Sequence, residues 1–321
     1  MLTRRTFLAA GAGLIACPYI ARAAKPLVLW GPPAAPSAAL AAAVAQGALK
    51  DLAPGAEFRV WRTPDEMRAG ISSGTMEAVV VPTYVAANLF NRGFGTRLVN
   101  VMTDGLLYVV APAGTVSTLA DLKGRKLSVP FRNDMPDFIL RRLLAANNLS
   151  RDELDIDYSG TPPEAIQMLL ARRVDAALLS EPACSVVLAR GGMTGHSFER
   201  AIDTRLAWQA VSGRDALPQA GLTATPKLFE RLGEAGIANL QGILEKTVAA
   251  IIADPGGAAD AAASALDIPK PMVSRSIPFS NLVARPAREA RADLESLFTA
   301  LLEEDARIVG GKLPEEEFYA L

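Results

Sequence analysis

Short apolar runs rich in β-branched residues alternate with longer helical patterns along most of this chain, and this alternation constrains the fold more than any other feature. Several runs are continuously apolar, as in strands that helices cover on both faces. Strands that alternate with helices form βα units around largely parallel sheets. The sequence therefore predicts an α/β protein with strands at residues 26–30, 58–61, 78–81, 98–102, 106–111, 126–129, 155–158, 175–179 and 207–211.

Several helices have a recognisable first turn. Thr63 and Thr161 are each followed by proline and, three residues later, by glutamate, which is the pattern of a capping box with proline at the first helical position. Ser150 repeats the box without proline, and Thr225 precedes a proline without the glutamate. Further helices are predicted at residues 37–49, 137–146, 237–253 and 286–302. After Gly233 the pattern is helical without strands, which predicts helices packed outside a finished core.

The first 23 residues are typical of an export signal. Arg4 and Arg5 precede a short apolar segment at residues 7–16, the arrangement of a twin-arginine signal. Small residues around Ala23 favour cleavage there and a soluble mature chain from Ala24 in the periplasm. Leu14 to Cys17 resembles a lipoprotein box, so a lipid anchor on Cys17 is the alternative.

Charge and residue counts exclude several function classes. Cleavage after Ala23 removes three of the 33 basic residues and none of the 34 acidic ones, which gives a net charge of −4 and argues against nucleic acid as a partner. The mature chain would keep one cysteine, Cys184, and therefore no internal disulfide. The single histidine, His196, follows a glycine-rich segment, so zinc sites and Ser-His or Cys-His catalysis are not expected. We expect no metal and no cofactor.

Residues 160–182 resemble the second-lobe core of substrate-binding proteins from ABC importers of the nitrate, sulfonate and taurine type. In that family a Gly/Ser-rich loop, a capped helix and a "VDA" strand lead to an acidic residue and a proline. The matching segments here are residues 159–161, 162–172, 174–176 and 181–182. Residues 119–130 resemble the start of the same lobe. Where family members often carry an aromatic residue before the acidic residue and proline, this chain has Leu179 and Ser180.

The resemblance implies a type II periplasmic binding protein fold, in which two α/β lobes close on a ligand. It places lobe one at residues 24–110 and 207–321, with the C-terminal helices packed on it, and lobe two at residues 111–206. Each lobe would hold a mostly parallel sheet flanked by helices. Ligands of open α/β sheets bind beyond the carboxyl ends of the strands, where helix N-termini favour anions.

That rule selects five loops. In lobe one, the loop that follows the first strand offers Trp30, Gly31, Pro32 and Ser37, either as ligand contacts or as a rigid connection. Thr83 and Tyr84 end another strand, and Tyr84 could equally be a core residue.

The lobe-two loops offer the charged candidates. Arg132, Asn133 and Asp134 follow one strand; Arg132 could clamp an oxyanion with its planar guanidinium, and Asp134 could cap the next helix. Thr161 could donate to a ligand or act as a cap alone. Ser180 and Glu181 end the VDA strand, and Glu181 together with Arg132 would suit a zwitterion such as a taurine-like compound.

The sequence thus predicts a monomeric, non-enzymatic solute-binding protein that delivers a small anionic or zwitterionic solute, such as a sulfonate, nitrate or taurine-like compound, to a membrane permease. A ligand sensor for a membrane signalling partner is one alternative. An enzyme built on a binding-protein fold is another.

Overall fold

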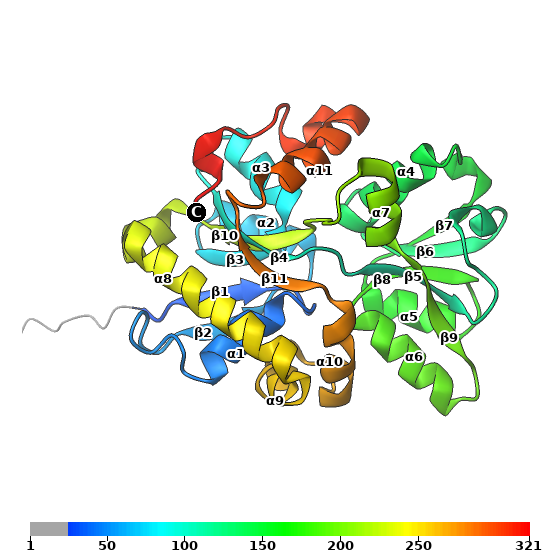
Figure 1. The fold of residues 1–321 in the computed structure, drawn as a ribbon, viewed down its shortest axis with the longest axis horizontal. Coiled ribbons are helices and arrows are strands. Elements are labelled where there is room, and N and C mark those ends of the chain that lie inside the picture. The colour runs from blue at the N-terminus through cyan, green and yellow to red at the C-terminus, as the bar shows by residue number, and fades with distance from the viewer. Residues whose placement is uncertain (1–24) are drawn as a thin grey trace, which may run out of the picture.

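The computed structural model describes residues 25–321, which form two lobes, each built on one β-sheet (Figure 1). The predicted export signal, its cleavage site and Cys17 lie outside the described residues. The first sheet has the order β11-β4-β10-β3-β1-β2. Its strands are β1 (Val28–Gly31), β2 (Glu57–Val60), β3 (Ala78–Pro82), β4 (Arg97–Thr103), β10 (Ala220–Ala224) and β11 (Leu282–Pro286).

The second sheet has the order β7-β6-β8-β5-β9. Its strands are β5 (Leu107–Pro112), β6 (Lys126–Pro130), β7 (Asp155–Ser159), β8 (Ala176–Ser180) and β9 (Phe198–Asp203). β6 pairs in parallel with β7 and β8, and β5 runs antiparallel between β8 and β9. In the first sheet β1 pairs in parallel with β2 and β3, whereas β10 runs antiparallel to both β3 and β4.

Because of these strand directions, the carboxyl ends of the parallel strands in each sheet point toward the other lobe. β4 leads directly into β5, so the carboxyl ends of β4 and of the strands that share its direction point toward lobe two. The first residue of β5, Leu107, is paired with the last residue of β8, Ser180, so the carboxyl end of β8 points back toward lobe one. Loops at the ends of both sheets therefore meet between the lobes, where the sequence predicts a ligand.

Helices cover both faces of each sheet. In Figure 1, α2 (Pro64–Ser72), α3 (Thr83–Asn91) and α11 (Arg291–Glu304) lie above the first sheet, and α1 (Ser37–Ala45), α9 (Pro255–Leu266) and α10 (Lys270–Ser276) lie below it. The long α8 (Pro226–Ala253) packs with α1 and α9 in one buried apolar cluster. In lobe two, α5 (Pro162–Leu170) and α6 (Ala183–Met193) share one apolar cluster, and α4 (Met135–Ala146) and α7 (Thr204–Ser212) cover the other face.

The threonine caps predicted at Thr63 and Thr161 are confirmed. The reciprocal bond of each predicted capping box is displaced by one residue, since the Glu66 and Glu164 carboxylates accept from the N–H groups of Arg62 and Gly160. Each threonine Oγ1 accepts a hydrogen bond from the backbone N–H of the glutamate three residues on, at 3.2 Å for Glu66 and 3.4 Å for Glu164. The cap at Ser150 exists, but it starts only a short 3₁₀ turn (Arg151–Glu153). Thr225 precedes α8 without capping it through its side chain.

Five segments differ from the sequence-based prediction. Residues 207–211 are not a strand but part of α7, because the Asp203 carboxylate caps a helix through the N–H groups of Arg205 and Leu206. Strands β9, β10 and β11 were not predicted. β11 ends at Pro286 on the edge of its sheet, where proline is tolerated, so α11 begins at Arg291 and not at Pro286.

The predicted lobe boundaries also need correction. The boundary at 110/111 falls inside β5, which belongs entirely to the second sheet, and the boundary at 206/207 falls inside α7, which packs on lobe two. The chain crosses between the sheets near residues 104–106 and 213–219. The α/β class, the two lobes and the C-terminal helices on lobe one are as predicted.

Candidate ligand-binding site between the lobes

A cavity of about 480 Å³ lies between the lobes, at the carboxyl ends of strands from both sheets. Lobe one contributes the loop after β1, the end of β2 and the connection between α9 and α10. Lobe two contributes the loop after β6, the end of β8, and residues of α5 and α6. The lining residues are Pro32, Pro33, Ala34, Trp61, Arg62, Phe131, Thr161, Pro162, Pro163, Ile166, Gln167, Ser180, Pro182, Ala183, Val186, Arg190, Leu266, Asp267, Ile268 and Pro269.

Tight packing fixes the lobe-one wall. A Cβ atom on Gly31 would lie 2.2 Å from Ser37 Oγ, so only glycine lets the loop pass this close to the start of α1. The Trp61 side chain is buried, and its Nε1 donates to the Val80 carbonyl at 3.0 Å, which holds the indole at the end of β2. The backbone N–H of Ala35 donates to the Glu181 carbonyl at 3.3 Å and so joins the two lobes beside the cavity.

Lobe two contributes the hydroxyl groups. Thr161 uses its oxygen as the acceptor of the helix cap, so its hydroxyl proton is available to another acceptor. Ser180 is half-buried at the end of β8 and lines the same cavity. The two hydroxyl groups lie at the starts of α5 and α6, where the helix dipoles favour negative charge.

Few charged groups line the cavity. The Arg62 guanidinium lies 3.3 Å from the Asp267 carboxylate, and both side chains are exposed. Arg190 is exposed at the far end of α6 and forms no ion pair within residues 25–321. Two cations and one anion leave a local charge of about +1, which suits a ligand with one negative charge.

Glu181 does not line this cavity. Its side chain is fully buried within lobe two, where it forms an ion pair with Arg200, with Nε donating to Oε1 at 2.6 Å. Ser185 Oγ donates to the other carboxylate oxygen at 2.9 Å. Burial raises the pKa of the Glu181 carboxyl, and the Arg200 charge opposes that rise. The carboxylate is therefore committed to internal partners.

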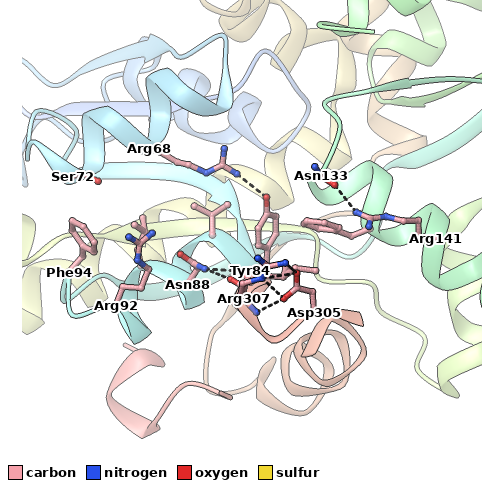
Figure 2. Close-up of a pocket in the computed structure, with 14 residues that line it drawn as sticks. Arg68, Ser72, Tyr84, Asn88, Arg92, Phe94, Asn133, Arg141, Asp305 and Arg307 are labelled. Carbon is pink, nitrogen blue, oxygen red and sulfur yellow. Dashed lines mark hydrogen bonds and ion pairs between the residues drawn. The ribbon is translucent and has the colours of Figure 1, made fainter. Parts of the chain in front are cut away.

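A second groove, of about 530 Å³, opens between the lobes on the side of α2, α3 and α4 (Figure 2). The loop after β6 separates it from the first cavity, since Phe131 lines the cavity and Asn133 lines the groove. Arg68, Arg92, Arg141 and Arg307 line the groove, but three of them are neutralised by carboxylates: Arg68 by Asp134, Arg141 by Asp137 and Glu304, and Arg307 by Asp305.

Beside this groove, Tyr84 of lobe one and Asp134 of lobe two join the lobes. The Tyr84 hydroxyl donates to Asp134 Oδ1 at 2.7 Å. Arg68 Nη2 donates to Tyr84 Oη at 3.0 Å, the bond that Figure 2 shows, and to Asp134 Oδ2 at 3.4 Å. Asp134 also caps α4 through the Met135 N–H, as predicted. Burial raises the pKa of both groups, so near pH 7 the tyrosine keeps its proton as a donor. We call these three side chains the interlobe clasp.

The structure thus brings together only some of the predicted ligand contacts. Pro32, Thr161 and Ser180 line the cavity. Trp30 packs against the core, Thr83 is buried and donates to the Pro218 carbonyl, and Arg132 lies over the Tyr158 ring. Gly31 at the end of β1 packs against Ser37 at the start of α1, and Tyr84 and Asn133 line the groove. A joint clamp by Arg132 and Glu181 has to be given up, because Glu181 is paired with Arg200 inside lobe two.

The sequence analysis did not predict the aromatic lining residues Trp61 and Phe131, or the lining residues 266–269 of lobe one. Trp61 was counted as the end of a strand and Phe131 as the residue before Arg132, although both lie at strand ends where the loop rule could have selected them. Residues 266–269 could not have been found, because α9 and α10 approach the cavity only through their packing with α1 and α6.

Residues 25–321 contain no group of His, Cys, Asp and Glu side chains that could hold a metal ion, and none of their helices combines the length and the apolar character that crossing a membrane requires. Cys184 is buried, which raises the pKa of its thiol well above the usual value. His196 is half-buried, and its Nδ1 lies 3.2 Å from the Thr194 hydroxyl oxygen.

Comparison with known proteins identifies the fold. No protein-family model matches the sequence, and no curated protein matches it. Among solved structures, an ABC transporter protein from Parabacteroides distasonis is 20% identical, with a TM-score of 0.74 over 92% of this chain and 98% of its own. The periplasmic aliphatic sulphonate binding protein SsuA from Escherichia coli is 17% identical, with a TM-score of 0.69 over 90% of this chain and 96% of its own.

A third similar structure is the periplasmic nitrate-binding protein NrtA from Synechocystis PCC 6803. It is 12% identical, with a TM-score of 0.62 over 78% of this chain and 69% of its own. The chain therefore has the two-lobed fold of periplasmic binding proteins from ABC importers, as the resemblance of residues 119–182 predicts.

Proposed function

We propose that this chain is the extracytoplasmic solute-binding component of an ABC importer. It captures a small anionic solute between its lobes and delivers it to a membrane permease, without covalent chemistry. The observation that carries the proposal is the cavity of about 480 Å³, because loops at strand ends of both lobes line it. A ligand there contacts both lobes only when they are closed.

Ligand binding then shifts the population toward the closed form, because the ligand has more contacts in that form. The interlobe clasp and the bond from Ala35 to Glu181 are contacts of the same closed form. Binding proteins for sulphonate and nitrate share this fold, which supports a solute of related chemistry. We further propose residues 1–23 as the export signal, and the periplasm as the location of a monomeric mature protein.

A thermal-shift screen of residues 24–321 tests the binding step. A ligand present at about 1,000 times its dissociation constant stabilises the folded state by about 4 kcal/mol, which raises the unfolding midpoint of a protein of this size by several degrees. Deletion of the gene is expected to abolish uptake of the same solute by intact cells. Binding without loss of uptake would contradict the importer role.

A further inference from the structure

We infer that the cavity selects an organic anion with an aromatic ring and a single oxyanion group, and that it discriminates against bare inorganic oxyanions and zwitterions. This inference rests on the proposed function, which it narrows to one class of solute.

Backbone donors are scarce around the cavity. Six of its lining residues are prolines and have no N–H group: Pro32, Pro33, Pro162, Pro163, Pro182 and Pro269. Pro162 and Pro163 occupy the first two positions of α5, where a helix otherwise presents free N–H groups to an anion.

The remaining backbone groups are mostly occupied. The N–H groups of Ala34, Trp61, Phe131 and Ile268 donate to backbone carbonyls, and that of Arg62 donates to the Glu66 carboxylate. Ala35, next to the cavity, donates to Glu181 across the lobes. The N–H groups of Thr161 and Ala183 on this lining donate to no acceptor within residues 25–321.

A small inorganic oxyanion loses its whole hydration shell in a closed cleft and needs several donors to replace it. Two N–H groups and the hydroxyl groups of Thr161 and Ser180 can hold one oxyanion group at the starts of α5 and α6. The other side-chain donors on the lining, those of Arg62, Gln167 and Arg190, are exposed, so the donors at the helix starts do not surround an ion on all sides. Bare nitrate and sulfate are therefore poor ligands.

The cavity also offers no free carboxylate to an ammonium group. Asp267 is the only lining carboxylate, and Arg62 already pairs with it. Glu181 is buried with Arg200, and Asp134 belongs to the interlobe clasp. A zwitterion such as taurine would lose the hydration of its ammonium group without gaining a carboxylate partner.

Apolar and aromatic surface makes up the rest of the lining. Trp61 of lobe one and Phe131 of lobe two line it together with Ile166, Val186 and Ile268. Phe131 has a left-handed backbone, with φ of 61°, which is an unfavourable conformation for a bulky residue. Strain of this kind persists where surrounding structure or function requires it, and here it brings an aromatic ring to the wall of the cavity.

The test is a titration of residues 24–321 with a matched series of anions. Benzenesulfonate and methanesulfonate share the oxyanion group and differ in the ring; nitrate, sulfate and taurine complete the series. We expect benzenesulfonate to bind about 100-fold more tightly than methanesulfonate, because the ring buries apolar surface against Trp61 and Phe131. We expect nitrate, sulfate and taurine to bind more weakly than benzenesulfonate.

A substitution separates the role of the ring from folding. Phe131→Gly removes the aromatic wall and also relieves the left-handed backbone, so the free protein is expected to fold normally. The affinity for benzenesulfonate should fall about 10-fold while that for methanesulfonate stays unchanged. Phe94→Ala, at an exposed phenylalanine on the other groove, is the control and should change neither affinity.

Each result decides the inference. Tighter binding of nitrate, sulfate or taurine than of benzenesulfonate would overturn it and leave the binding function intact. An equal effect of Phe131→Gly on both sulfonates would overturn the role of the ring. If a folded protein binds none of these anions, the result would contradict the proposed function as well.

Discussion

Arg200→Met leaves the buried Glu181 carboxylate without its charged partner, and the cost can be worked out from the structure. Glu181 has no exposed surface, so it cannot regain water while the lobe stays folded. Protonation of the carboxyl limits the cost. At pH 7 this protonation lies 2.5 pH units above the ordinary pKa of 4.5, and each unit costs about 1.36 kcal/mol, which gives about 3.4 kcal/mol.

A smaller loss does not depend on pH. Arg200 also donates to Ser185 Oγ at 2.9 Å, and its guanidinium carbon lies 3.7 Å from the centroid of the Phe279 ring. Loss of this stacking costs about 1 kcal/mol. The total at pH 7 is therefore about 4 kcal/mol, within the range for breaking one side of a buried ion pair.

The sign of the pH dependence follows from the direction of the pKa. Without Arg200 the folded-state pKa of Glu181 is raised further above its unfolded value. The associated stability is fully present below the unfolded pKa and is lost as the pH rises through the folded pKa. At pH 5 the protonation cost falls to about 0.7 kcal/mol, so the total deficit should fall to about 2 kcal/mol.

Urea unfolding of the variant and the wild type at pH 5 and pH 7 measures both values. Arg59→Met, which breaks an exposed ion pair with Glu57, is the control and should cost less than 1 kcal/mol at either pH. The double variant Glu181→Gln with Arg200→Met should lose the pH dependence. An Arg200→Met deficit that is the same at both pH values would refute the reasoning.

The remaining predictions concern the caps, the clasp and the first loop. Thr161→Ala and Thr63→Ala remove equivalent helix caps, and each should lower the free energy of unfolding by about 1 kcal/mol. Only Thr161→Ala should also weaken solute binding, because Thr161 lines the cavity. Equal effects of the two substitutions on binding would exclude Thr161 as a ligand contact. Tyr84→Phe removes the hydrogen bond from Tyr84 to the Asp134 carboxylate between the lobes, which is worth about 1.5–3 kcal/mol. Titration calorimetry should then show at least 10-fold weaker solute binding. Unchanged affinity would mean that the interlobe clasp does not favour the closed form. Gly31→Ala should lower the temperature of the unfolding midpoint, because the new Cβ atom would clash with Ser37 Oγ. Adding Ser37→Ala should restore part of the lost stability. No recovery in the double variant would mean that the clash lies elsewhere.

Local signals predicted most of lobe two and the core of lobe one. The threonine caps at Thr63 and Thr161 and the apolar runs of β3 and β8 specify their elements within a few residues, because each signal is satisfied by neighbours in sequence. Strand β10 was not predicted, because its residues are small and its pairing with β3 and β4 is long-range in sequence. The apolar residues of α7 fit a strand or a helix, and only the Asp203 cap decides between them.

The candidate site was predictable in its loops but not in its side chains. The strand-end rule found Pro32, Thr161 and Ser180, because a parallel sheet fixes where its loops meet. The rule does not say which way a side chain turns. Glu181 turns into lobe two because Arg200, on the unpredicted β9, lies there, and Arg132 turns onto Tyr158. The contribution of residues 266–269 depends on helix packing, which leaves no pattern in the sequence.

Closure of the lobes around a solute is the central claim, and a distance between labels on the two lobes tests it most directly. Cysteines at exposed Lys50 and Arg173 would carry spin labels on lobe one and lobe two, and the native Cys184 is fully buried and should stay unlabelled. Pulsed dipolar spectroscopy should show a broad distance distribution that becomes narrow and shorter when benzenesulfonate is added. An unchanged distribution at a concentration of benzenesulfonate that saturates the protein would contradict closure as the mechanism.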